Sequence, residues 1–299
     1  MSPDDVMIIV IAGLLSTSCA LLGSFLVLRR QALLPDAVSH AVLPGIVLIF
    51  LLTGERASAA TVLGATAFGV VCVVGFDWLR RTGLVGSDAA LALIFPALFS
   101  LGILGISRFA SGAHIDLDSA IYGDLTFAPL RTMDIAGVDV PRSLVVTGAA
   151  TLVTVLLVVL LWRPLHAASF DPAFAELGGL RGRLAGQVLL VAVAGLAVVA
   201  FDSVGAILVI TFFVVPASTA RLLVHRLGTM LVVAVAAGWL SSFAGHRIAI
   251  SLDTSIPGTI GLTSGALFLL TLLLAPRRGL VWRRRARRSA PRAAGAKVG

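Results

Sequence analysis

An aspartate and a histidine four residues apart form the most chemically informative pair in this chain of 299 residues. On a helix, Asp36 and His40 lie on one face, about one turn apart. A carboxylate oxygen and an imidazole nitrogen suit Mn, Fe and Zn better than Ca or Cu(I). The pair therefore indicates a transition-metal site with Asp36 and His40 as ligands. A second copy of the chain, or groups from another segment, could complete it.

A purely structural role explains the same residues. Pro35 fits the first turn of a helix, and Asp36 beside it complements the helix dipole and can contact His40. However, ionisable groups in a membrane span cost about 2.5 to 3.5 kcal/mol each on insertion scales, which favours a functional task. Pro44 lacks an N–H, so it leaves the His40 carbonyl without its helical donor and provides an oxygen beside the imidazole.

A second motif lies between two apolar segments, in residues 169–179. An aspartate that can cap a helix is followed by a proline suited to the first turn, and paired glycines can end the helix. Such a short helix can dock into a groove on a partner and transmit its motion, or it can lie on the membrane surface. The residues assigned to coupling are Asp171, Pro172, Phe174, Leu177 and Gly178.

The composition places both motifs in a membrane protein. Of all residues, 58% are hydrophobic and 13% are charged, with a mean hydropathy of +1.04, whereas soluble domains are about 45 to 50% apolar. We therefore expect an all-α, polytopic membrane protein of about eight to nine transmembrane helices. The first segment lacks the basic start of a cleavable signal peptide. The candidate spans are residues 6–28, 36–52, 59–79, 89–107, 144–162, 184–201, 204–220, 229–250 and 258–275.

Two of these spans look interrupted. The second contains Pro44 and Gly45, and the seventh contains Pro216 and a glycine near its start. Interrupted spans often line transport pathways, because freed backbone groups need protein or water to satisfy them. We therefore assign Pro44, Gly45 and Pro216 to the pathway, although an ordinary proline kink is the alternative.

The net charge of +8 is concentrated in one tail. Residues 277–299 carry eight Arg, one Lys and no acidic residue, so the rest of the chain sums to −1. We expect a membrane domain over residues 1–276 and a disordered basic tail over 277–299, which lies against anionic headgroups rather than nucleic acid.

The distribution of basic residues between the spans predicts the orientation in the membrane. The connections on one side, together with the C-terminal tail, carry 18 Lys and Arg residues, and those on the other side carry five. This predicts a cytoplasmic C-terminus and, with nine spans, an external N-terminus. The external connection 108–143 is acidic, as expected of a surface that attracts cations.

The chain has no ATP-binding loop of its own. Such a loop needs a lysine after its glycines, and the only lysine is Lys297. Active transport would therefore depend on a partner ATPase or on an ion gradient. No nucleophile and base can be assembled from the motifs, so an enzyme is not expected.

Taken together, the motifs resemble the membrane permeases of bacterial manganese, zinc and iron ABC importers. The resemblance implies a type II ABC importer-like permease domain in the bacterial plasma membrane, working as a dimer by alternating access. Its implied partners are cytoplasmic ABC ATPase subunits and an extracytoplasmic metal-binding lipoprotein. The stretches that carry it, in the family's order, are residues 36–45, 87–91, 116–123, 170–179 and 204–221.

The resemblance also implies roles for particular residues. Asp36 and His40 would belong to the metal path, and residues 171–178 would form the coupling helix. The cargo would be a divalent metal ion, with manganese favoured over zinc or iron and no permanently bound cofactor. The chain departs from the family at Ser119, where a histidine is common, and at Asp202, where a neutral residue is expected.

Two other kinds of transporter fit the same motifs. In a secondary cation carrier coupled to protons, Asp36 and His40 would act as a proton relay. A permease for an iron chelate or cobalamin would instead need a wide channel without paired ligands. Dependence of transport on ATP distinguishes the first alternative from an ABC importer.

Overall fold

The chain folds as a bundle of helices that differ widely in length. The computed structural model describes residues 2–53, 59–109, 125–130, 132–135 and 138–275. Within these residues, nine helical stretches are long and apolar enough to cross a membrane, with α2 and α3 counted together. The helices are α1 (Pro3–Leu28), α2 (Leu34–Ala41), α3 (Leu43–Thr53), α4 (Ala59–Arg81), α5 (Ser87–Phe109), α7 (Arg142–Leu160), α8 (Trp162–Phe170), α9 (Pro172–Leu177), α10 (Gly182–Val204), α11 (Ala206–Leu223), α12 (Leu227–Leu252) and α13 (Ile256–Leu274).

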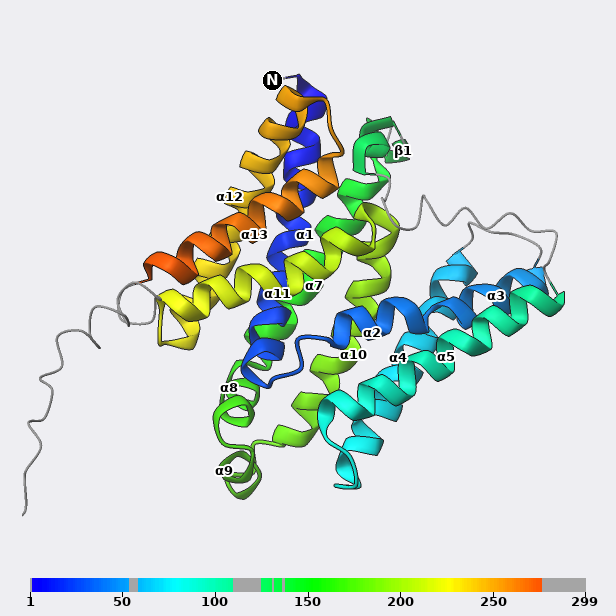
Figure 1. Cartoon of the computed structure of the whole chain (residues 1–299), viewed down its shortest axis with the longest axis vertical. Coiled ribbons are helices and arrows are strands. Elements are labelled where there is room, and N and C mark those ends of the chain that lie inside the picture. The colour runs from blue at the N-terminus through cyan, green and yellow to red at the C-terminus, as the bar shows by residue number, and fades with distance from the viewer. Residues whose placement is uncertain (1, 54–58, 110–124, 131, 136–137, 276–299) are drawn as a thin grey trace, which may run out of the picture.

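The long helices form two groups with α10 between them (Figure 1). One group contains α1, α7, α11, α12 and α13, with α1 packed against α7, α11 and α12. The other contains α2 to α5, which pack against one another. Helix α10 contacts α4 and α2 on one side and α7, α1 and α11 on the other, so it connects the two groups.

Small residues and hydroxyl groups hold the first group together. A Cβ atom on Gly23 of α1 would collide with the Phe213 carbonyl of α11, so these two helices cross with their backbones in close approach. The indole N–H of Trp239 in α12 donates to Thr17 Oγ1 at 2.9 Å. In lipid, close packing and interhelical hydrogen bonds replace the hydrophobic effect as the source of helix association, which explains this choice of residues.

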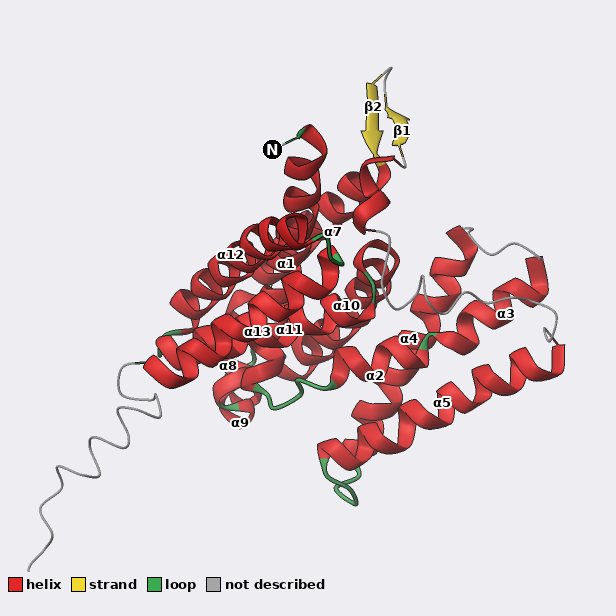
Figure 2. Cartoon of the chain, turned by 45° about the horizontal axis from the view of Figure 1, so that its top comes forward, coloured by secondary structure: helices red, strands yellow, loops and turns green. Residues whose placement is uncertain are grey.

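A β-hairpin lies at the end of the molecule where α1 begins (Figure 2). Strands β1 (Thr132–Ile135) and β2 (Val138–Pro141) pair antiparallel, with Thr132 opposite Pro141. They follow a 3₁₀ helix, η1 (Leu125–Leu130), that contacts α1. The prediction of an all-α fold is therefore confirmed for the membrane part, but it did not include this hairpin. The stretch 116–123, which includes Ser119, and the basic tail 277–299 lie outside the described residues.

Only one of the two expected interruptions falls inside a span. Helix α2 ends at Ala41 and α3 begins at Leu43, so the second span breaks at Val42, whose carbonyl accepts from the amides of Gly45 and Ile46 at 3.0 and 3.1 Å. Helix α11, in contrast, runs unbroken through Pro216. The second break lies before α11, at Gly205, where a φ of 81° favours glycine.

Candidate metal site

Helix α2 presents Asp36 and His40 from a short amphipathic segment. Pro35 occupies the first turn, as its fixed φ allows, and Asp36 lies beside it at the positive end of the helix dipole. The buried face of α2, which includes Leu34 and Val38, packs into the core. The opposite face carries Asp36 and His40, because residues four apart align on a helix.

The two predicted ligands approach each other within one chain. His40 Nε2 lies 3.7 Å from Asp36 Oδ1, and the two side chains remain 49% and 41% exposed. Ser39 donates from Oγ to the Asp36 carbonyl. The predicted contact between Asp36 and His40 is therefore present, and both side chains stay accessible to a further ligand.

Two aromatic rings of α5 contact the histidine. The His40 ring centroid lies 5.9 Å from that of Phe95 and 5.6 Å from that of Phe99, the latter edge to face. Such contacts favour one orientation of the imidazole. Because Phe95 and Phe99 are four residues apart, they line one face of α5, and the site lies between α2 and α5.

The described part of the chain supplies too few ligands to hold a metal ion firmly. Among the described residues, no group of three or more His, Cys, Asp or Glu side chains could bind a metal. Asp36 and His40 make two donors, whereas a transition metal takes four or more. Their exposure leaves room for donors from a second molecule.

Two of the residues predicted to line the pathway, Pro44 and Gly45, lie where α3 packs between α4 and α5. A Cβ on Gly45 would collide with the Gly64 carbonyl of α4, and a Cβ on Gly102 of α5 would come within 2.9 Å of the Pro44 nitrogen. The two contacts hold the start of α3 close to both helices, one turn beyond His40. Pro216, the third predicted pathway residue, is buried in α11.

The predicted coupling helix exists at the end of the bundle opposite the hairpin. Helix α8 ends at Phe170, Asp171 separates it from α9, and α9 ends at Leu177. The glycine pair closes the turn, with Gly179 at a φ of 68°. Leu177 is 90% exposed, while the side chains of Pro172 and Phe174 lie outside the described residues.

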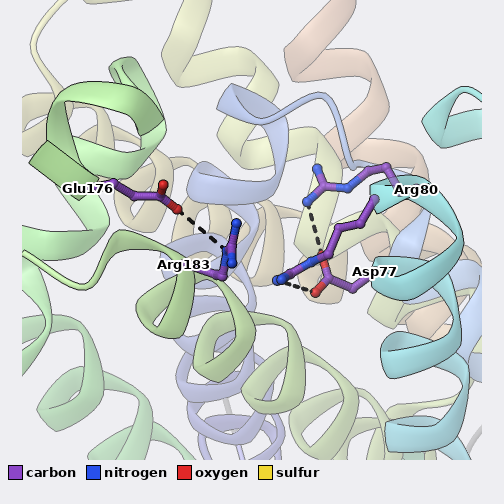
Figure 3. Close-up of polar contacts among 5 residues, drawn as sticks. Asp77, Arg80, Glu176 and Arg183 are labelled. Carbon is purple, nitrogen blue, oxygen red and sulfur yellow. Dashed lines mark hydrogen bonds and ion pairs between the residues drawn. The ribbon is translucent and has the colours of Figure 1, made fainter. Parts of the chain in front are cut away.

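An ion pair joins α9 to the helix that follows it. Glu176 lies 3.5 Å from Arg183 near the start of α10 (Figure 3). Both side chains are more than half exposed, so the pair contributes little stability. Helix α9 also contacts α10, which in turn contacts α2 and α4.

Two further polar residues have buried atoms and were not assigned to a site from the sequence. His246 is fully buried, and its Nε2 lies 3.2 Å from Asp5 Oδ1, which ties α12 to the start of α1. Arg29, at the end of α1, is half-buried, and its Nη2 is enclosed.

Comparison with known proteins gives a consistent assignment. Residues 5–275 match the ABC 3 transport family. The zinc transport system membrane protein TroD of Treponema pallidum is 39% identical over 92% of this chain and 75% of its own length. The manganese transport system membrane protein MntD of Bacillus subtilis is 34% identical over 92% and 93%. PsaBC from Streptococcus pneumoniae, solved in complex with Fab, superimposes with a TM-score of 0.72 at 26% identity, over 91% of each chain.

Nine candidate membrane helices in the described residues and a family match over nearly the whole length define a polytopic transport protein. The chain belongs to the ABC 3 transport family and is the membrane permease of an ABC transporter, in which a separate subunit hydrolyses ATP. The resemblance inferred from the motifs is confirmed.

Proposed function

We propose that this permease imports a divalent transition-metal ion, with manganese favoured over zinc and iron, by ATP-driven alternating access. The observation that carries the proposal is the accessible Asp36–His40 pair, whose oxygen and nitrogen donors suit these metals. Relatives named for manganese and zinc transport support the same cargo. The metal is cargo, so the permease needs no permanently bound cofactor.

The site is completed, in this proposal, by a second copy of the permease. Asp36 and His40 lie in an apolar span, and exposing each to lipid would cost about 2.5 to 3.5 kcal/mol. Facing another permease removes that cost and brings two carboxylates and two imidazoles together. The exposed apolar side chains of α5, including Leu93, Leu101 and Ile103, fit the same interface.

The end of the bundle that carries α8 and α9 faces the cytoplasm in this proposal. Arg80, Arg81, Arg181 and Arg183 gather there, as the positive-inside rule requires. The ATPase subunits bind the coupling segment, residues 170–179, where the exposed Leu177 suits an apolar groove.

A metal-binding lipoprotein delivers the ion at the opposite end of the bundle. Residues 1–276 form the permease domain, and the basic tail 277–299 is cytoplasmic.

The direct test uses the permease reconstituted with its ATPase subunits in lipid vesicles. ATP on the cytoplasmic side should drive uptake of Mn²⁺, and a panel with Zn²⁺ and Fe²⁺ should rank the three ions. A proton gradient without ATP should drive none.

The same vesicles test the alternative function. Metal uptake driven by a proton gradient in the absence of ATP would overturn the proposal and favour a secondary carrier. Uptake of a metal chelate but of no free ion would overturn the choice of cargo.

A further inference from the structure

A pocket lies at the end of the bundle that carries α8 and α9 (Figure 1). Its walls come from the last residue of α1, Leu28, the last residue of α8, Phe170, and the turn between α11 and α12. Its volume is about 190 Å³, below the roughly 300 to 1,000 Å³ of pockets that hold a whole small molecule. The pocket therefore suits a small group, such as a phosphate and its neighbouring atoms, rather than a nucleotide.

One wall of the pocket is basic. Arg221 and His225 both line it, and both residues are exposed. Nη1 of Arg221 donates to the Val27 carbonyl at 3.1 Å, which holds the guanidinium against the end of α1. In the described part of the chain, the residues that line the pocket include no carboxylate. A guanidinium beside an imidazole N–H is suited to a phosphate group, so the pocket favours an anion.

The other walls of the pocket are apolar. They are formed by Leu28, Phe170, Leu227 and Met230. Leu227 and Met230 are almost completely buried and form the inner part, whereas Phe170 remains 59% exposed. A ligand that joins an anionic group to hydrocarbon matches both kinds of wall, because burial of its apolar part is favourable as well. Inorganic phosphate matches the basic wall alone.

The pocket lies at a membrane surface. Residues 224–226, which border it, form the short turn between two candidate membrane spans, α11 and α12. Along α8, the ring of Trp162 lies 5.8 Å from that of His166, which lies 5.1 Å from that of Phe170, and such residues gather at membrane interfaces. Helices α1, α11 and α12 belong to the group without α5, the helix assigned to the second copy, so this side of the molecule borders lipid.

We propose that this pocket binds the headgroup of an anionic phospholipid, with the phosphate on Arg221 and His225 and the start of the acyl chains along the apolar walls. Basic pockets between membrane helices suit anionic headgroups. Net charge selects among lipids, because Arg221 and the neighbouring Arg226 repel the ammonium group of phosphatidylcholine. Since Phe170 is also the first residue of the coupling segment, residues 170–179, a bound lipid contacts the start of that segment.

The experiment measures lipid binding to the full-length permease in detergent by native mass spectrometry. Wild type should bind one phosphatidylglycerol at least about fivefold more tightly than phosphatidylcholine with the same acyl chains. Arg221→Gln should weaken the binding of phosphatidylglycerol by about fivefold, the effect typical of one basic side chain at an anionic membrane surface. Arg226→Gln is the matched control, because it removes the same charge from an exposed residue outside the pocket lining, and it should stay within about twofold.

A second variant tests the pocket without removing a charge. Val224 lines the pocket, so Val224→Phe should fill part of it and also weaken the binding of phosphatidylglycerol by about fivefold. This variant decides the matter if Arg221→Gln does not fold, since it keeps the hydrogen bond from Arg221 to Val27.

Four results would overturn the inference. They are equal affinity of wild type for the two lipids, equal losses for Arg221→Gln and Arg226→Gln, displacement of phosphatidylglycerol by an equal concentration of inorganic phosphate, and loss of ATPase co-purification by Val224→Phe with lipid binding unchanged. The last result would assign the pocket to the ATPase. The binding assay needs no metal ion, ATP or partner subunit, so this inference and the proposed function can fail separately.

Discussion

In the proposed function, individual side chains decide what the permease recognises, and the assignment rests on the Asp36–His40 pair. Their spacing in the sequence suffices to predict a shared helical face, and the 3.7 Å approach agrees with it. The contacts of His40 with Phe95 and Phe99 do not follow from spacing, because these rings come from another helix more than 50 residues away. Local geometry of the site was therefore predictable, and its surroundings were not.

The buried His246 leads to a prediction about stability. His246→Ala should lower the free energy of unfolding by about 2 to 4 kcal/mol, because it leaves a cavity in the α1–α12 contact and removes the partner of Asp5. His225→Ala, at an exposed position, should change it by less than about 0.5 kcal/mol. Thermal unfolding in detergent measures both variants. Equal stability of the two would show that the buried contact does not matter.

His246 also shows why the burial and the partners of some residues cannot be predicted from the sequence. Its place near the end of an apolar span predicts an interfacial side chain, since a charged or polar tip usually reaches water there. The partner that allows burial, Asp5, lies 241 residues earlier in the chain. Pairings at that separation depend on which helices become neighbours, and composition and periodicity carry no information about that.

At the scale of elements, close helix contacts make α3 sensitive to one methyl group. Gly45→Ala should cost about 1 to 3 kcal/mol, because the new Cβ meets the Gly64 carbonyl, which cannot move aside as a side chain could. Gly148→Ala in α7, where no atom lies within 4 Å, should be neutral or stabilising by up to about 1 kcal/mol. Unfolding midpoints compare them, and a stable Gly45→Ala variant would contradict the close approach of α3 and α4.

The proposed coupling role of α9 gives a prediction about binding. Leu177→Ser should weaken association with the ATPase subunits by about tenfold, since it removes an exposed apolar anchor. Leu84→Ser is the matched control, because Leu84 is similarly exposed, at 85%, in the loop between α4 and α5. Co-purification of the ATPase measures the difference. If both variants retain the ATPase equally, α9 is not the docking element.

Element boundaries were largely predictable because long apolar runs have few alternatives in a membrane protein. Eight of the nine expected spans each correspond to one helix, and the second corresponds to α2 and α3 together. The start of α9 at Pro172 and its end before the glycine pair also agree with the sequence pattern. The hairpin was not predicted, because strands of four residues are too short to show a clear alternation of apolar and polar residues. The continuity of α11 through Pro216 depends on packing against neighbouring helices, which can satisfy a freed carbonyl.

For the whole molecule, the proposed second copy packs against the surface that carries α5. Ile103→Cys, on the α5 face that continues from Phe99, should form a disulfide or short cross-link between copies in a background without Cys19 and Cys72. Leu152→Cys, 70% exposed on α7, should not, because it would face lipid. Non-reducing gels of membranes distinguish them. Cross-linking through Leu152 alone would place the interface elsewhere.

The central claim is that ATP-driven metal transport passes the Asp36–His40 pair, and one uptake measurement tests it most directly. Cells or vesicles with the double substitution Asp36→Ala and His40→Ala, at equal protein level, should take up Mn²⁺ at least about tenfold more slowly than wild type, because both ligand types are lost. Ser39→Ala, which changes the same helix between the two ligands, should retain uptake. Undiminished Mn²⁺ uptake by the double variant would contradict the assignment of this site.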